Sequence, residues 1–375
     1  MRILTIIGTR PEAVKMAPVV LELQQQPRVE NIVCVTAQHR QMLDQVLRVF
    51  NISPDLDLNL MIPDQTLAQI ASSLFLKVDE VIKSIQPDWI LAQGDTTTVM
   101  VTSILAYYNR VKFGHIEAGL RTQNKWQPFP EEIHRKICAV TADVHFAPTE
   151  YSRMNLIREG ICPETIFVTG NPIVDALQKI KREPVPSQVL EWISSWKISP
   201  TRKLVFITAH RRENFGKPME NIFHAVKRLA NTLGDTIHII FPVHLNPHVQ
   251  EPAYQILGNL QNVTLLPPID YLPLVHLLTH SSLVLTDSGG IQEEATCLEI
   301  PTLVLREETE RPEGIEAGIL RLVGTDEEVI FNESLTILKN SGKFSLRISN
   351  PFGDGNAAKR ISQILLKGDT CESKK

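Results

Sequence analysis

The feature that most constrains the fold is a regular alternation of short apolar runs with longer amphipathic segments. In the first half of the chain the apolar runs are residues 3–7, 32–35, 89–92, 112–116, 144–147 and 166–168. Runs of this length are typical of strands that are buried on both faces of a parallel sheet. Helical patterns lie between them, for example at residues 40–50, 67–85, 98–109 and 131–142. This alternation predicts a doubly wound α/β domain.

The alternation begins again after a segment of different composition. Residues 181–202 contain three prolines, two tryptophans and no strand pattern, so we predict a linker there. Further apolar runs follow at residues 204–208, 237–241, 263–265, 283–286, 302–305 and 320–323. The sequence therefore predicts two Rossmann-like domains, over residues 1–180 and 203–350, that face a central cleft. A final helix over residues 354–367 is expected to pack back on the first domain.

Composition and charge limit the classes of function. The 375 residues are enough for two domains. The formal net charge of −4 gives no basic field that would favour nucleic acid or a membrane surface. No apolar stretch is long enough to span a bilayer, and the N-terminus does not resemble a signal peptide. The five cysteines are scattered without disulfide or metal spacing. We therefore expect a cytoplasmic protein without nucleic-acid or membrane partners.

Ligands of open α/β sheets bind beyond the carboxyl ends of the strands, so the residues after each run form the candidate site. After the first run, Gly8 and Thr9 lead into a helix with Arg10 at its N-terminus and Lys15 about one turn in, which is typical of an anion site. Asp95 and Glu117 follow two other runs and are candidates for general acid–base work. Asp95 could instead cap the next helix.

Two further pairs have more than one interpretation. Glu131 and Arg135 are four residues apart, so they can meet on one helix face either in a site or as an ordinary surface pair. His115 and Glu117 alternate as two metal ligands on a strand would, but no third ligand is evident nearby. We therefore predict no metal.

In the second domain, His210 and His244 follow two strands, and His210 can serve as acid or base near neutral pH. Residues 288–290, Ser-Gly-Gly, join a strand to a helix, where backbone N–H groups can approach a phosphate. Glu294 in that helix could bind a ribose diol. A glycine-rich turn without a ligand is the alternative. Residues 353–358 fit GxGxxA but follow no strand, so we predict no nicotinamide cofactor and, more broadly, no cofactor.

Taken together, the motifs resemble those of the bacterial, non-hydrolysing UDP-N-acetylglucosamine 2-epimerases. The matching segments, in chain order, are GTRPEAVKMAP, TAQHRQMLDQVL, GDTTT, HIEAGLRT, PEEIHRK, VTGNPIVDAL, HRREN, PVHLNP, LTDSGGIQEEA, TERPE and LVGTD. The resemblance implies a GT-B-like fold, a homodimer, and reversible conversion of UDP-GlcNAc to UDP-ManNAc. In that family the reaction is an anti elimination of UDP to a 2-acetamidoglucal, followed by re-addition of UDP.

The resemblance also implies roles for residues. The catalytic positions would be Asp95, Glu117, Glu131 and His210. The substrate-binding positions would be Arg10, Lys15, Arg135, His210, Ser288, Gly289, Gly290, Glu294 and Arg311. Some relatives have a second, activating UDP-GlcNAc site, which would fall on Gln38, His39, Gln41, Glu131, Arg211 and His244. Those relatives carry a basic residue just before Gln-Thr-Leu, where this chain has Asp64, so we expect activation to be weak here.

Three other functions stay open at this point. The GT-B architecture mostly hosts glycosyltransferases, so a UDP-sugar transferase is the first alternative. A hydrolysing epimerase, which releases ManNAc and UDP, is the second. A UDP-sugar sensor without catalysis is the third, although a sensor needs only the UDP contacts and not the three carboxylates.

Overall fold

The computed structural model describes residues 1–375 except 37–39, 61, 63–64, 340–349 and 373–375. The chain forms two compact units. The first unit comprises Met1–Gln178 and Phe352–Lys375, and the second comprises Lys179–Pro351. Within the described part of the chain, no helix is both long and apolar enough to cross a bilayer.

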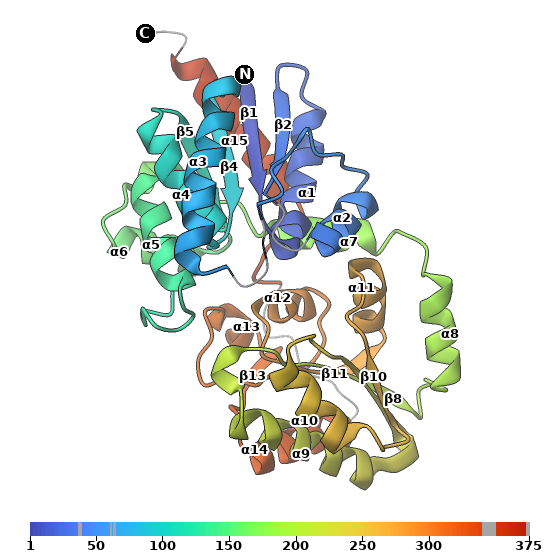
Figure 1. The fold of residues 1–375 in the computed structure, drawn as a ribbon. Helices are drawn as coiled ribbons and strands as arrows, with labels where there is room; N and C mark the ends of the chain where they lie inside the picture. The colour runs from blue at the N-terminus through green and yellow to red at the C-terminus, as the bar shows by residue number, and fades with distance from the viewer. Residues whose placement is uncertain (37–39, 61, 63–64, 340–349, 373–375) are drawn as a thin grey trace. The chain divides into compact units, whose positions relative to one another are not determined.

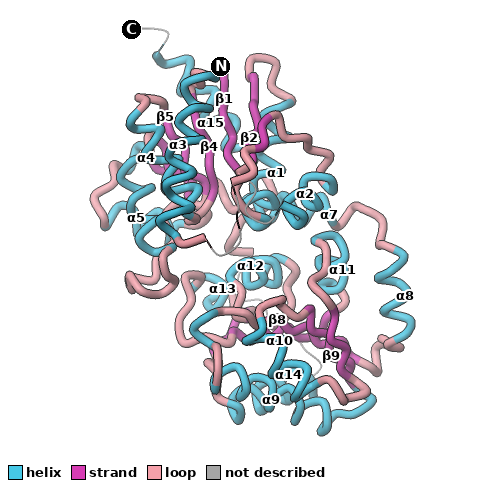
Figure 2. The backbone as a smooth tube through the Cα atoms, in the orientation of Figure 1, coloured by secondary structure: helices cyan, strands magenta, loops and turns pink. Residues whose placement is uncertain are grey.

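The first unit is built on a seven-stranded parallel sheet with the order β3-β2-β1-β4-β5-β6-β7. Strands β1, β2, β4 and β5 of this sheet are labelled in Figures 1 and 2. Its strands are β1 (Arg2–Ile7), β2 (Glu30–Val35), β3 (Leu56–Asp57), β4 (Trp89–Gln93), β5 (Lys112–Ile116), β6 (Val144–Ala147) and β7 (Ile166–Val168). The strand order reverses between β1 and β4. A reversal of this kind is the point at which open α/β sheets bind ligands, so the segments after β1 and β4 are the first place to look for a site.

Helices cover the sheet of the first unit because its strands are apolar on both faces. They are α1 (Arg10–Gln24), α2 (Arg40–Val49), α3 (Leu67–Ile85), α4 (Thr97–Tyr108), α5 (Glu131–Thr141), α6 (Glu150–Arg158), α7 (Pro172–Ile180) and α15 (Ala357–Glu372). Leu4 and Ile6 of β1 pack in one core cluster with α3 and α4. Ile3 and Ile7 alternate with them and are also fully buried, which places them on the opposite face. α15, the last helix of the chain, packs against α1.

The second unit repeats this plan with a six-stranded parallel sheet of order β10-β9-β8-β11-β12-β13. Its strands are β8 (Lys203–Thr208), β9 (Ile237–Pro242), β10 (Val263–Leu266), β11 (Ser281–Thr286), β12 (Thr302–Val304) and β13 (Leu320–Leu322). Its helices are α8 (Ser187–Ser195), α9 (Lys217–Leu233), α10 (Pro247–Leu257), α11 (Tyr271–Thr279), α12 (Gly289–Cys297), α13 (Pro312–Glu316) and α14 (Glu327–Lys339). Here the order reverses between β8 and β11, which directs attention to the segments after these two strands.

The predicted class of two doubly wound α/β domains agrees with this architecture, and every predicted strand is present within two residues of its expected bounds. Two elements were not expected. β3 has only two residues, which is too short for a periodic pattern. α8 lies inside the predicted linker, where Ser187 to Ser195 form a helix after Pro186.

Candidate active site

The segment after β1 forms the N-terminus of α1, with Arg10 as the first residue of the helix. Thr9 caps the helix by accepting a hydrogen bond from the backbone N–H of Glu12. The buried Glu12 carboxyl accepts from Gly8 N at 2.7 Å and from Thr9 Oγ1 at 3.0 Å. Burial raises the pKa of Glu12 to about 7, although the bond from Gly8 acts in the opposite direction. Glu12 was not predicted as a site residue, but Thr9-x-x-Glu12 is the pattern of a capping box.

Glu117 lies directly after β5 with a backbone φ of +63°, a region that residues other than glycine seldom adopt. Its buried carboxylate contacts the ammonium of Lys15. Oε2 of Glu117 also accepts a hydrogen bond from Nδ2 of Asn171 at 3.0 Å. The ion pair with Lys15 and the hydrogen bond from Asn171 both act on Oε2, so they set the direction of the Glu117 carboxylate. Lys15, predicted as a substrate contact, is thus placed against a predicted catalytic residue.

Asp95 lies after β4, and its carboxylate is held by the guanidinium of Arg135. Nε and Nη2 of Arg135 lie 2.8 and 2.7 Å from Oδ2 of Asp95. His134, one residue earlier in α5, has Nδ1 2.9 Å from the backbone oxygen of Asp95. The N-cap of α4 is Thr96, so the alternative that Asp95 caps this helix is wrong. Asp95 is instead bound by the helix that carries Glu131.

α5 begins at Glu131, which is half-buried. Arg135 in the next turn contacts Glu132 at 3.2 Å as well as Asp95. The sequence pattern predicts only Glu131, four residues away, as a partner of Arg135. In the structure Arg135 also contacts Asp95, which lies 40 residues earlier in the chain. Arg135 is buried, so this group is not an ordinary surface pair.

The ring of His115, on β5, is hydrogen-bonded to the loop that precedes Asp95. Its Nε2 lies 2.7 Å from the backbone oxygen of Gly94, and since a carbonyl only accepts, Nε2 carries the proton. Burial lowers the pKa of His115 to about 4, so the ring is neutral at pH 7. Nε2 is therefore engaged by the backbone of the loop that precedes Asp95. Among the described residues, no three or more His, Cys, Asp or Glu side chains are grouped to hold a metal ion.

In the second unit, Asp287 organises the loop after β8. Its fully buried carboxylate accepts hydrogen bonds from the backbone N–H groups of His210 and Arg211, each at 2.9 Å. It also accepts from Nδ2 of Asn214 at 3.0 Å. Asp287 was not predicted as a site residue, although it follows β11 and could have been found as an acid at a strand end. One carboxylate therefore joins the predicted HRREN motif to the predicted Ser-Gly-Gly turn.

His210 stacks on His244, which follows β9. The two ring centroids are 5.5 Å apart and the rings are inclined by 20°. Burial lowers the pKa of His210, although the carboxylate of Asp287, 3.7 Å from Nδ1, raises it. Nδ1 of His244 accepts a hydrogen bond from Asn246 N at 3.1 Å. A residue predicted for catalysis thus contacts one predicted for regulation.

The turn after β11 leads into α12 with Ser288 as its N-cap residue, and the Ser288 hydroxyl makes no capping bond. A helix N-terminus of this kind has N–H groups available for an anion. A Cβ on Gly289 would lie 2.7 Å from Nη1 of Arg311, whereas a Cβ on Gly290 would enter open space. Gly289 therefore allows Arg311 to lie against the first turn of α12. Glu294, the predicted ribose ligand, is buried further along this helix.

Arg311 is fixed by two carboxylates, although it is buried. Its Nε donates to Oε1 of Glu293 at 2.7 Å, and its Nη1 lies 2.6 Å from Oε1 of Glu310. Glu310 in turn accepts from Nη1 of Arg306 at 3.1 Å. The guanidinium of Arg311 is thus held at the glycine-rich turn by two carboxylates of the protein.

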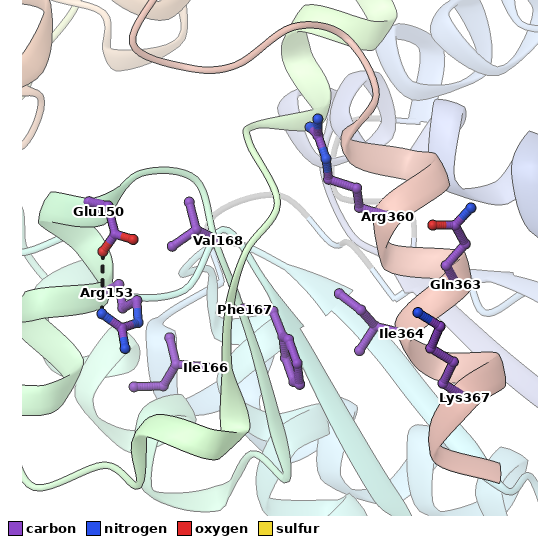
Figure 3. Close-up of a pocket in the computed structure, with 9 residues that line it drawn as sticks. All are labelled: Glu150, Arg153, Ile166, Phe167, Val168, Arg360, Gln363, Ile364 and Lys367. Carbon is purple, nitrogen blue, oxygen red and sulfur yellow. Dashed lines mark hydrogen bonds and ion pairs between the residues drawn. The ribbon is translucent and has the colours of Figure 1, made fainter. Parts of the chain in front are cut away.

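A separate pocket of about 300 Å³ lies in the first unit, beside β7, α6 and α15 (Figure 3). It is lined by Glu150, Arg153, Ile166, Phe167, Val168, Arg360, Gln363, Ile364 and Lys367. Arg153 pairs with Glu150, and Arg360 pairs with Asp354. None of its nine lining residues is a predicted site residue, so we do not assign the active site to it.

These features define a class of protein: two parallel, doubly wound α/β units, one with carboxylates held by buried cations at its strand ends and one with a glycine-rich helix N-terminus beside a fixed arginine. Comparison with known proteins identifies the family. Residues 21–366 match the family model of UDP-N-acetylglucosamine 2-epimerase. The chain therefore belongs to the UDP-N-acetylglucosamine 2-epimerase family.

Individual relatives agree over nearly the whole chain. The UDP-N-acetylglucosamine 2-epimerase of Bacillus subtilis is 47% identical over 98% of this chain and 95% of its own length. The Escherichia coli K12 enzyme is 48% identical, with 97% of this chain and 98% of its own length covered. A crystal structure of the Neisseria meningitidis UDP-GlcNAc 2-epimerase bound to UDP-GlcNAc has a TM-score of 0.93 and 44% identity, covering 98% of this chain and 100% of its own. These relatives confirm the predicted UDP-N-acetylglucosamine 2-epimerase family and its GT-B-like fold class.

Proposed function

We propose that the protein is an isomerase that interconverts UDP-GlcNAc and UDP-ManNAc without hydrolysing them. One observation carries the proposal. In a chain that matches the epimerase family over residues 21–366, the carboxylates of Asp95 and Glu117 lie at strand ends and each contacts a buried cation. Carboxylates held in fixed positions at strand ends suit general acid–base work.

The chemistry of the sugar favours elimination. The C2 hydrogen has no adjacent carbonyl, so it becomes acidic only as positive charge develops at C1. In the proposed first step the C1–O bond breaks and its electron pair leaves with UDP. An enzyme carboxylate takes the C2 proton, and a C1=C2 double bond forms, giving 2-acetamidoglucal. In the second step UDP adds back to C1 and a proton is returned to the opposite face of C2, so atoms and charge balance.

The residue roles follow the family resemblance. Asp95, Glu117 and Glu131 transfer the proton and stabilise charge at C1, and His210 lies near the leaving phosphate. The substrate-binding residues are Arg10, Lys15, Arg135, His210, Ser288, Gly289, Gly290, Glu294 and Arg311, of which Lys15 and Arg135 also contact the carboxylates of Glu117 and Asp95. The structure supports the phosphate roles in the second unit, because the uncapped α12 N-terminus and the fixed Arg311 guanidinium suit a diphosphate that has to stay bound after cleavage.

Incubation of the purified protein with UDP-GlcNAc alone in D₂O tests the proposal. We expect UDP-ManNAc to form and deuterium to enter at C2, as seen by NMR, without an acceptor, metal or added NAD. Release of free ManNAc and UDP would show a hydrolysing enzyme. A strict need for an acceptor would show a transferase, and tight UDP binding without turnover would show a sensor.

Regulation and assembly stay predictions. Gln38, His39 and Asp64 lie outside the described residues, and Gln41 lies in α2 with its side chain outside them. The contact of His244 with His210 supports a link between a second nucleotide and catalysis. Initial rates from UDP-ManNAc with and without trace UDP-GlcNAc measure activation, which we expect to be weak. Light scattering measures the molar mass in solution and so tests the predicted homodimer.

A further inference from the structure

Glu117 needs external support to keep its position. Its φ of +63° lies in the left-handed region, which costs a residue with a side chain of this length conformational energy. The carboxylate is also buried, so its orientation depends on the groups that contact it. Besides Lys15, one of these groups is the amide of Asn171, a residue for which the family resemblance gave no role.

Asn171 lies between β7 and α7, and its backbone and side-chain polar groups are all engaged. Its Nδ2 donates to Oε2 of Glu117 at 3.0 Å, and its Oδ1 accepts from Ile173 N at 3.1 Å, at the start of α7. Its backbone N–H donates to the backbone oxygen of Phe352 at 2.8 Å. The side chain is 1% exposed. The donor and the acceptor of this amide therefore serve different partners, which makes its two functions separable by substitution.

The third bond connects Asn171 to the segment in which the chain re-enters the first unit. The second unit starts at Lys179 and ends at Pro351, so α7 and Phe352 flank the two crossings of the chain. A Cβ on Gly170 would lie 3.2 Å from the Phe352 oxygen, so the two backbones are already in close contact. Asp175 of α7 strengthens this junction, because its carboxylate accepts from the first amides of α15, Ala357 N and Ala358 N.

We propose that Asn171 is a positioning residue for Glu117, which sets the direction of the carboxylate and fixes it to the junction between α7 and the returning chain. This inference rests on the proposed function, because it assumes that Glu117 takes part in the proton transfer. The side-chain N–H of Asn171 sets the direction of Oε2 of Glu117, while Lys15 supplies the opposite charge. Loss of the amide donor leaves the ion pair but frees the carboxylate to turn, and small displacements of a reacting group lower rates strongly.

Asn171→Asp separates positioning from folding. An aspartate keeps the acceptor for Ile173 N and leaves the backbone bond to Phe352 intact, so the start of α7 is preserved. It loses the donor to Glu117 and places a second carboxylate beside it. Asn171→Ser is the neutral counterpart, because a serine also accepts at a helix start but is too short to reach Glu117. If Asn171→Asp does not fold, Asn171→Ser provides the test.

The experiment measures kcat, the Kd for UDP, and kcat as a function of pH. We expect kcat to fall by about 10-fold or more in both variants, with the Kd for UDP within about twofold of wild type. In Asn171→Asp the acidic limb of the profile should move to higher pH, because a like charge opposes ionisation of the neighbouring carboxyl. Asn262→Asp is the control. The side-chain amide of Asn262 donates to Ala230 O and Gly234 O in the second unit, so its replacement should leave the pH profile of kcat unchanged.

Two results are decisive against the proposal. If wild type is active and Glu117→Gln is inactive, but both Asn171 variants keep the kcat and pH profile of wild type, then Asn171 has only a structural role and this inference alone fails. If wild type does not exchange C2 hydrogen at all, the proposed function fails and this inference fails with it. The two failures are therefore distinguished by the wild-type and Glu117→Gln measurements.

Discussion

Arg135 donates from Nε and Nη2 to one oxygen of Asp95, at 2.8 and 2.7 Å, and so fixes a carboxylate that lies 40 residues away in the sequence. The guanidinium is buried and also contacts Glu132. The carboxylate of Asp95, just after β4, is thus held by Arg135 of α5. This helix begins with another predicted catalytic residue, Glu131. This arrangement couples the orientation of two carboxylates to the packing of α5.

Arg135→Lys should lower kcat by about 10-fold or more while the protein stays folded, because one ammonium cannot reproduce two N–H groups in a fixed plane. Deuterium incorporation at C2 measures the loss. Lys136→Arg is the matched control on the same helix: its ammonium lies 3.8 Å from Glu159 and its side chain is 42% exposed, so kcat should not change. Full activity of Arg135→Lys would show that this orientation is not needed.

The three carboxylates should act in turnover and not in nucleotide binding. Asp95→Asn, Glu117→Gln and Glu131→Gln should each lower kcat by about 10²-fold or more, the scale for acid–base residues. Calorimetry should show nearly unchanged UDP affinity in each variant. Glu150→Gln, an exposed glutamate on α6 that pairs with Arg153, is the control. A variant that keeps near-normal turnover removes its residue from the proposed mechanism.

The strands and the positions of several candidate site residues could be predicted from sequence because both depend on local patterns. Buried parallel strands are short apolar runs, and ligand groups of α/β sheets follow them, so Asp95, Glu117, His210 and Ser288 were all found at strand ends. β3 was missed because its two residues carry no periodic signal.

The partners of these residues could not be predicted, because they depend on which strands and helices become neighbours. The sequence pairs Arg135 with Glu131 by helical spacing, while the fold brings Arg135 to Asp95. Asn171 contacts Glu117 across 54 residues, and only the placement of β7 and α7 in the first unit brings them together. Helical and strand periodicity gives no information on such contacts.

Gly289→Ala should weaken UDP binding through Arg311. The new Cβ would lie 2.7 Å from Nη1 of Arg311 and displace the guanidinium, so we expect a loss of about 1.5–3 kcal/mol in binding free energy, the scale for hydrogen bonds to charged groups. Gly290→Ala is the matched variant, because its Cβ meets open space. Equal losses in both variants, measured by calorimetry, would mean that the methyl group blocks UDP directly and that Arg311 is not the cause.

Asp287→Ala should destabilise the second unit. The substitution leaves the N–H groups of His210 and Arg211 and the amide of Asn214 without their buried acceptor, so unfolding free energy should fall by at least about 2 kcal/mol. Urea unfolding measures this loss. Asp326→Ala removes one exposed acceptor, for Val329 N, and should cost about 1 kcal/mol. Equal effects would contradict the central place given to Asp287.

The buried histidines of the first unit should make stability depend on pH. Burial lowers the pKa of His115 to about 4 and that of His145, its neighbour on β6, to about 3. Between these values and the ordinary histidine pKa of about 6.5, the unfolded chain binds more protons than the folded one. Their contribution is therefore complete above about pH 6.5 and is lost as the pH falls, by up to about 1.4 kcal/mol per pH unit for each histidine.

Glu12 acts in the opposite direction, since its pKa is raised to about 7 and the folded protein binds more protons than the unfolded chain between about 4.5 and 7. Variants must therefore be compared with wild type over the same pH range. His145→Gln, which stays neutral, should reduce the loss of unfolding free energy between pH 6.5 and 4, and Glu12→Gln should make that loss steeper. If the curves of His145→Gln and wild type are parallel from pH 6.5 to 4, His145 is not neutral and buried in the folded protein.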